Sequence, residues 1–208
     1  MRQNPRVDEL LTPSGPRRIL LIRHAQSEWN AAGRWQGQAD PPLSTFGVEQ
    51  AIGLAAHPLL APADRFVTSD LQRARQTAAA IADDRPIDVD AGLRELDVGS
   101  WSGRTRAAIE AAQPGAIDRY KAGETMWVGG ETLDEHATRA RAVALRLAGW
   151  PDSDELAVVS HGGTIRILLS LFLGMGDTGR ERFTHVHHAS VTALHRGITG
   201  WQLASFGV

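Results

Sequence analysis

The chain has 208 residues, of which 42% are hydrophobic and 22% are charged, as in an ordinary soluble globular protein. Lys and Arg number 22 against 24 Asp and Glu, and a formal net charge of −2 gives no indication of a nucleic-acid partner or an anionic membrane. The absence of cysteine excludes disulfides, thiolate metal ligands and a cysteine nucleophile, and is compatible with the cytoplasm.

Two regions are expected along the chain. Residues 1–16 are polar, contain three prolines and lack the apolar segment of a signal peptide, which predicts a flexible tail. Residues 17–208 are long enough for one domain with a sizeable core. The longest apolar run, Ile167 to Leu173, is interrupted by Ser170 and is too short to cross a bilayer, so we expect no membrane partner.

A short apolar run, Ile19 to Ile22, predicts a fully buried strand because it is continuous and rich in strand-favouring residues. Arg23 and His24 follow at its carboxyl end, where open α/β sheets form their ligand crevices. Taken alone, the dipeptide fits an exposed loop better than a site.

The next segment, 33–44, is rich in Gly and Pro and predicts a long loop, in which Gly37 is either a turn residue or a point of close backbone approach. Ser44 then has the position of a helix N-cap. The spacing of the following apolar residues predicts a core-facing stripe formed by Val48, Ala51, Ile52 and Ala55.

A second strand is expected at Arg65 to Thr68, followed directly by a helix in which Ser69 and Gln72 have the spacing of a capping box. Arg73 therefore lies near the start of this helix. Its guanidinium, beside free backbone N–H groups, suits an oxyanion, although a single Arg is more often a solvated surface residue.

An edge strand at Pro86 to Asp90 leads to Glu95, which is flanked by leucines and followed by glycines. A partly apolar setting raises the pKa of a carboxylate, so that Glu95 could donate a proton near neutral pH. The alternative is an ion pair with Arg94 or Arg104. Residues 104–130, with one helix expected at Thr105 to Ala112, form a lid, the wall of a specificity pocket, or a plain surface excursion.

Near the end of the chain, Thr132 and Glu135 form a capping box ahead of a long helix with one buried face. A buried strand from Leu156 to Ser160 then leads to His161, which is either a site residue or a satisfied core histidine. Gly162 and Gly163 open the next helix. Three strands are thus each followed by a candidate group, namely Arg23–His24, Arg73 and His161.

The last segment contains the string HVHH at 185–188 and a predicted β-hairpin, Ser190 to Leu194 with Trp201 to Ser205. His185 and His187 share one face of an extended chain, but no acidic or Cys ligand lies beside them. Packing within the hairpin region is therefore favoured over a metal site.

Four motifs occur in this order, and together they resemble the histidine phosphatase superfamily, the phosphoglycerate mutase-like proteins. They are RHAQSEWN at 23–30, SDLQRARQTA at 69–78, Glu95 within LRELDVGSWSG, and SHGG at 160–163. The loop from Gln36 to Ala51 is also similar. One departure is Ala25, where the family usually has Gly, and Gln26 replaces a common Glu.

The resemblance implies a single-domain α/β fold, with a mixed, mostly parallel central sheet and helices on both faces. It implies a phosphohistidine formed on His24, whose other ring N–H would be held by an acceptor such as a backbone carbonyl. Arg23, Arg73 and His161 would neutralise the phosphoryl oxygens, and Glu95 would be the proton donor. Substrate-binding roles are implied for Asn30, Gln36, Gly37 and Gly162. No metal or other cofactor is implied, because cationic side chains take the place of Mg²⁺.

Within the family, mutases carry a longer middle segment and a Tyr three residues after the acid. Here that position is Val98 and the middle is short, which favours a phosphatase acting on a small phosphomonoester, such as a sugar phosphate or a phosphoglycerate derivative. A mutase-type phosphoryl transferase and an inactive phospholigand-binding module are the alternatives. We expect a cytoplasmic protein. The sequence leaves the oligomeric state open, and a homodimer is the state to test.

Overall fold

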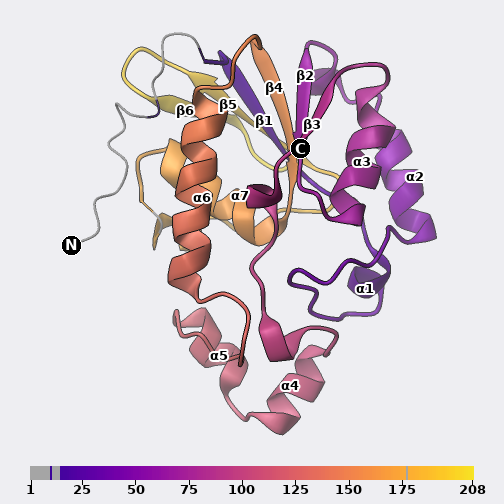
Figure 1. Ribbon diagram of the computed structural model, residues 1–208, viewed down its shortest axis with the longest axis vertical. Helices are drawn as coiled ribbons and strands as arrows, with labels where there is room; N and C mark the ends of the chain where they lie inside the picture. Colours follow the sequence, from indigo (N-terminus) through magenta and orange to yellow (C-terminus); the bar gives the residue numbers. More distant parts are fainter. Residues whose placement is uncertain (1–9, 11–14, 177) are drawn as a thin grey trace.

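The computed structural model describes residues 10, 15–176 and 178–208 of the chain (Figure 1). Most of the predicted N-terminal tail, residues 1–9 and 11–14, lies outside the described residues. Leu10 departs from the expectation of a free tail. Its side chain is buried, and its carbonyl accepts a 2.8 Å hydrogen bond from the indole of Trp201.

A single six-stranded sheet forms the centre of the protein, in the order β3-β2-β4-β1-β5-β6. Strands β1 to β4 are parallel, whereas β5 pairs antiparallel with β1 and β6 pairs antiparallel with β5. The predicted mixed, mostly parallel sheet is therefore confirmed. The strands are β1 (Arg18–Arg23), β2 (Arg65–Thr68), β3 (Ile87–Val89), β4 (Glu155–Ser160), β5 (Val191–Arg196) and β6 (Trp201–Ser205).

Within the described residues, seven α-helices surround the sheet and extend beyond one end of it (Figure 1). Two of them begin with the capping boxes Ser27–Asn30 and Thr132–Glu135, the second of which was predicted. The helices are α1 (Glu28–Ala31), α2 (Thr45–Leu54), α3 (Gln72–Ala82), α4 (Arg106–Ala112), α5 (Ala116–Lys121), α6 (Leu133–Ala148) and α7 (Gly162–Phe172).

The two faces of the sheet are covered by different helices, as alternating side chains of a strand require. Ile19 and Leu21 of β1 pack with apolar side chains of α6 and α7. Leu20 and Ile22 of the same strand pack on the other face, with side chains of α3 and with Leu54 of α2. This burial on both faces is why the central strands are continuous apolar runs.

Two local predictions on this second face fail, one of them in part. Within the predicted stripe of α2, Ala51 is buried, but Val48 and Ile52 are 45% and 63% exposed and Ala55 is exposed; Gly47 and Leu54 face the core with Ala51. Helix α3 begins without the expected capping box, because the Ser69 hydroxyl accepts from the N–H of Leu71.

Residues 104–130 form a small second layer beyond the sheet (Figure 1). The predicted helix is α4, with Thr105 as its N-cap, and a second helix that the sequence did not predict, α5, follows it. Both pack around an apolar cluster of their own, formed by Leu96, Val98, Trp101, Ile109, Ala116, Ile117, Trp127 and Leu133. No helix in the described part of the chain is long and apolar enough to cross a membrane.

Candidate active site

The ends of two neighbouring strands bring the two candidate histidines together. Strands β1 and β4 are parallel, and their register pairs Arg23 with Ser160. The backbone N–H of His24 donates to the Ser160 carbonyl at 3.0 Å, which continues the pairing beyond the strand. The rings of His24 and His161 lie with their centroids 5.0 Å apart. His161 is therefore beside the predicted nucleophile.

His24 has the tautomer that a nucleophile needs. Its Nδ1 lies 2.7 Å from the carbonyl of Ala25, and since a carbonyl only accepts, Nδ1 donates and Nε2 keeps its lone pair. This is the backbone acceptor predicted from the sequence. Burial lowers the pKa of His24 well below 6.5, and the nearby cations Arg73 and Arg23 lower it further. The ring is neutral at physiological pH.

Two buried arginines flank the histidines. Arg73 donates to the carbonyls of Gly37 and Ala39 at 2.9 and 2.8 Å, which fixes its guanidinium against the loop after α1. Arg23 donates to the Val186 carbonyl at 2.6 Å. Burial lowers the pKa of each arginine to about 10, so both remain cations at neutral pH. The Nε atom of each is buried without a partner among the described residues.

His161 is not a satisfied core histidine. It is 1% exposed, and neither ring nitrogen has a hydrogen-bond partner in the part of the chain that the structure describes. Burial and the neighbouring Arg73 lower its pKa well below 6.5. Buried polar groups without partners are rare because they cost free energy. His161, Arg23 and Arg73 thus each have a buried nitrogen without a described partner and lie close to His24, and such a set of donors suits a tetrahedral oxyanion.

Glu95 is held by backbone donors rather than by an arginine. Its two oxygens accept from the N–H groups of Gly163 and Leu96 at 2.9 and 3.0 Å. The expected alternative of a pair with Arg94 is wrong, because Arg94 forms a bidentate pair with Asp70.

The predicted rise in the Glu95 pKa is also wrong. Burial raises the pKa, but the influence of His136, the two backbone N–H groups and Arg23 outweighs it, so the pKa lies below its ordinary value. His136 is a buried neighbour that the sequence did not indicate. Its Nε2 lies 2.9 Å from the Thr164 hydroxyl, which is itself 3.5 Å from a Glu95 oxygen.

The glycines after His161 make room for the site. A Cβ atom on Gly163 would lie 2.4 Å from Glu95 Oε1, and one on Gly162 would lie 3.4 Å from the Arg23 guanidinium carbon. Gly162 therefore packs directly against Arg23. A direct contact of Gly162 with substrate stays a prediction.

The remaining predicted residues lie in α1 and in the loop after it, which Arg73 holds. The Ser27 hydroxyl lies 2.9 Å from Asn30 Oδ1 and 2.7 Å from Gln36 Oε1, so it links the two amides. Gly37 has a φ of +54°, and a Cβ there would meet the Val98 nitrogen at 2.8 Å. Only glycine fits this position. Phosphate contacts of these three residues stay predictions.

Histidines from the string at 185–188 complete the surroundings of the nucleophile. Arg23 donates to His185 Nε2 at 2.9 Å, and the His188 ring centroid lies 5.8 Å from that of His24. Burial lowers the pKa of His188 to about 3, and Arg23 adds to that effect. In the sequence, the string HVHH was the only feature that drew attention to His188, and it did not indicate that His188 lies near His24.

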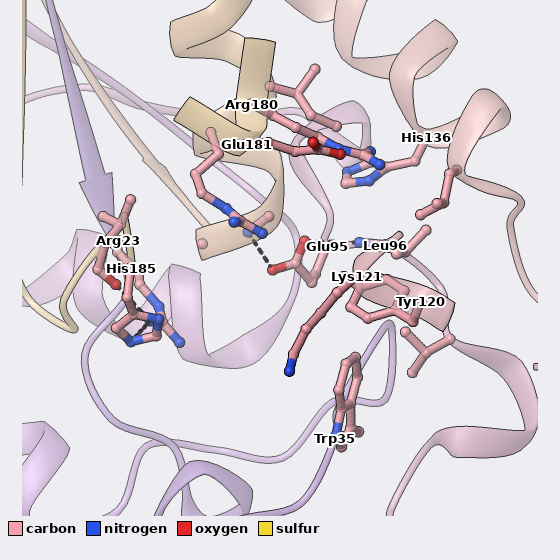
Figure 2. A pocket seen from close by; sticks show the side chains of 17 residues that line it. Arg23, Trp35, Glu95, Leu96, Tyr120, Lys121, His136, Arg180, Glu181 and His185 are labelled. Carbon is pink, nitrogen blue, oxygen red and sulfur yellow. Dashed lines mark hydrogen bonds between the residues drawn. The ribbon is translucent and has the colours of Figure 1, made fainter. Parts of the chain in front are cut away.

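A cavity of about 660 Å³ opens beside these groups. Figure 2 shows Glu95 near its middle, with Arg23 and His185 on one side and His136 and Tyr120 on the other. Trp35, Tyr120 and Lys121 also line it. Since Tyr120 and Lys121 belong to α5, the segment 104–130 contributes a wall of the cavity, one of the alternatives that the sequence left open.

Comparison with known proteins agrees with this geometry. A model of the histidine phosphatase superfamily (branch 1) matches residues 19–208. The chain belongs to this superfamily. It is 37% identical over 175 residues to a glucosyl-3-phosphoglycerate phosphatase of Mycolicibacterium vanbaalenii, covering 76% of this chain and 75% of that protein. It is 34% identical over 189 residues to a Proteus mirabilis protein named "Probable phosphoglycerate mutase GpmB", covering 88% and 86%.

A solved structure shows the same fold at a similar level of identity. It is the mycobacterial glucosyl-3-phosphoglycerate phosphatase in complex with VO3, with a TM-score of 0.80 and 32% identity over 92% of this chain and 99% of that one. The histidine phosphatase fold and membership predicted from the four motifs are therefore confirmed. Phosphomonoester hydrolysis is the activity that these phosphatase relatives support.

Proposed function

We propose that the protein hydrolyses a small phosphomonoester through a phosphohistidine on His24. The observation that carries the proposal is a buried, neutral imidazole, with the ring centroid of His161 5.0 Å away and with the cations Arg73 and Arg23 near enough to lower its pKa further than burial alone does. In-line displacement at phosphorus needs positioning and charge neutralisation above all. The two arginines supply two fixed positive charges, which match the charge of a phosphate dianion.

In the first step, His24 Nε2 forms a bond to phosphorus while the bond from phosphorus to the ester oxygen breaks. Glu95 gives its proton to that oxygen, so the alcohol leaves neutral. In the second step, Glu95 takes a proton from water, the resulting hydroxide attacks phosphorus, and the P–N bond breaks with its electron pair returning to His24. Phosphate then leaves, and Glu95 releases the proton it took from water to the solvent.

The lowered pKa of Glu95 has a place in this mechanism. A phosphate dianion bound beside the carboxylate disfavours its charged form and raises its pKa. Glu95 therefore acquires its proton when substrate binds, and returns to the carboxylate form when phosphate leaves. Each protonation state arises at the step that uses it.

The nucleophile is tested by trapping. The enzyme is incubated with a phosphodonor and quenched in alkali, and we expect a base-stable, acid-labile phosphate on His24. The variant His24→Ala should take up no label, yet should still bind vanadate. Turnover by His24→Ala would contradict the assignment, and a wild-type protein that no donor labels would favour the phospholigand-binding module.

Hydrolysis is favoured over mutase activity by two features. Val98 stands three residues after Glu95, and the middle segment is short. A mutase retains its phosphoenzyme by excluding water, whereas the cavity here opens onto the site. The experiment supplies 3-phosphoglycerate with a 2,3-bisphosphate primer. Release of phosphate without fast isomerisation is expected, and the opposite result would establish the mutase.

The related phosphatases make glucosyl-3-phosphoglycerate the first substrate to test, beside other phosphorylated metabolites. The small-molecule substrate, the cytoplasmic location and the absence of a nucleic-acid partner rest on the site and on the near-neutral, cysteine-free composition. The homodimer stays a prediction, which light scattering of the purified protein tests directly.

A further inference from the structure

The cavity is larger than a phosphoryl group requires. Its volume of about 660 Å³ is within the range of about 300–1,000 Å³ that accommodates a whole small-molecule ligand. Arg23 and Glu95 mark the end where phosphate is handled. The rest of the lining therefore contacts the part of the substrate that leaves as the alcohol.

Two arginines line this remaining part and have no acidic partner. Arg166 lies on α7 and Arg180 lies in the 3₁₀ segment Thr178–Arg182. Both are half-buried, and no ion pair within residues 15–176 and 178–208 involves either of them. Arginines elsewhere in the fold do pair, for example Arg65 with Asp88 and Arg146 with Asp90.

The two arginines lie at different depths of the cavity. Arg166 is close enough to Arg23 and His185 to lower their pKa values further, although burial is the larger cause in each case. Burial likewise dominates the low pKa of His136, to which Arg180 adds. In Figure 2, Arg180 lies on the side of His136, away from Arg23. Of the two, Arg166 is therefore the nearer to the phosphate end.

Charge and shape indicate what the two arginines would receive. The phosphate dianion is already balanced by Arg23 and Arg73, and of the acidic side chains lining the outer cavity only Glu181 remains, which is exposed. Lys121 is paired with Asp118 at 3.0 Å. A guanidinium fork matches the two oxygens of a carboxylate. Trp35 and Tyr120 add aromatic surface for the carbon skeleton between the two anions.

We propose that Arg166 and Arg180 form a second anion subsite, which binds a carboxylate on the same substrate that presents its phosphate to His24. This inference rests on the proposed phosphatase function and names its substrate class, a small phosphorylated carboxylic acid. Arg166 and Arg180 are then specificity-determining residues, because they select among phosphomonoesters by the group opposite the phosphate.

The test compares two substrates that differ only at the proposed contact. These are 3-phosphoglycerate and the glycerol phosphate of matching configuration, in which CH₂OH replaces the carboxylate. We expect the wild-type kcat/KM to be about 10–100-fold higher for 3-phosphoglycerate, as charge-assisted hydrogen bonds of this kind provide. Arg166→Gln and Arg180→Gln should each reduce this ratio, with most of the loss on the carboxylate substrate.

The control variant is Arg182→Gln, which removes an exposed arginine of the same segment that does not line the cavity. It should keep the wild-type ratio. Equal rates on both substrates, or a ratio that neither cavity variant changes, would overturn the subsite. If the protein hydrolyses neither of these substrates nor any other phosphomonoester, the phosphatase function itself is refuted.

A third substrate separates a carboxylate from a second phosphate. Suppose that kcat/KM is about tenfold higher for 2,3-bisphosphoglycerate than for 3-phosphoglycerate, and that both variants lose this difference while their kcat/KM for 3-phosphoglycerate is unchanged. The arginines then bind phosphate, and the carboxylate assignment is wrong. Thermal unfolding of each variant identifies a protein that has failed to fold. In that case Arg166→Lys and Arg180→Lys, which keep charge but lose the fork, should show an intermediate ratio.

Discussion

Replacing Gly163 by alanine should move the proposed proton donor without removing it. The new Cβ would lie 2.4 Å from Glu95 Oε1 and 3.1 Å from its carboxyl carbon. Carbon and oxygen atoms in ordinary contact are about 3.5 Å apart. The Glu95 carboxylate must therefore shift by about 1 Å, because the helix backbone that carries Gly163 is packed against the sheet.

A displacement of about 1 Å in a catalytic group can cost about 10²-fold in rate. We expect this loss in kcat/KM for an alkyl phosphate, whose leaving alkoxide needs a proton. The loss should be below about 10-fold for p-nitrophenyl phosphate, whose leaving group does not. Both values come from steady-state assays at one pH.

Stability separates this effect from unfolding. Position 163 is in the first turn of α7, and alanine in a helix is favoured over glycine by up to about 1 kcal/mol. The variant should unfold at a temperature no lower than the wild type. The matched control is Gly53→Ala in α2, where nothing lies within 4 Å of the new Cβ. Nearly full activity of Gly163→Ala on the alkyl substrate would refute Glu95 as the donor in this geometry.

Three further predictions concern charge. Arg73→Ala should lower kcat by at least about 10²-fold, the loss of one oxyanion donor, and a change of a few fold in the same assay would argue against its contact with phosphate. Because the pKa of His24 lies well below 6.5, protonation of the nucleophile should not reduce kcat/KM at pH 6.5, so a pH–rate profile with an acid limb centred there would contradict a neutral buried ring. The pKa of His136 is lowered to about 4 in the folded protein, so as the pH falls the unfolded chain binds this proton before the folded protein does. Urea titrations should therefore show the free energy of unfolding falling as pH drops from about 6.5 towards 4, by up to about 1.4 kcal/mol per pH unit from this residue. A constant or rising free energy of unfolding over this range would refute the linkage.

Another prediction concerns the support of Glu95. Arg139 donates to the carbonyls of Gly92, Arg94 and Glu95 and pairs with Glu131 at 2.6 Å. Arg139→Ala leaves these groups without their donor and should lower the free energy of unfolding by about 3 kcal/mol in urea titrations. Arg146→Ala, which removes a more exposed pair, should cost less than about 1 kcal/mol. Equal losses in the two variants would contradict this ranking.

The strands and the groups after them could be predicted because their signals are local. Ile19 to Ile22 is a continuous apolar run that stops at a cation, and such a run has few alternatives to a buried strand. The capping box of Thr132 and Glu135 likewise lies within four residues. The acceptor for His24 Nδ1 is the carbonyl of the next residue, Ala25, so it too could be anticipated from the chain itself.

The predictions that failed depended on contacts between distant segments. Gly47 comes so close to the backbone of Gln26 that a Cβ there would lie 1.9 Å from the Gln26 carbonyl oxygen. This contact sets the rotation of α2 and turns Val48 and Ile52 outward, which no helical periodicity could indicate. Similarly, the N–H of Gln72 is capped by the carboxylate of Asp40, 32 residues earlier.

The prediction for the Glu95 pKa failed for the same reason. Leucines beside it in the sequence predicted a raised pKa, but Gly163 and His136 reach it from α7 and α6 and lower the pKa instead. His188 was missed because its role depends on the 5.8 Å between its ring and that of His24. Sequence reasoning thus located the groups proposed to react but not the residues that tune them.

The separate apolar cluster under α4 and α5 has a consequence for how new specificities arise. Tyr120 and Lys121 reach the cavity from a unit that packs around its own aromatic residues, whereas His24 and His161 are anchored in the sheet. Mutations that reshape this unit can change which alcohol is accepted while the machinery of phosphoryl transfer stays intact. Swapping the segment between relatives is therefore a direct route to redirecting the enzyme.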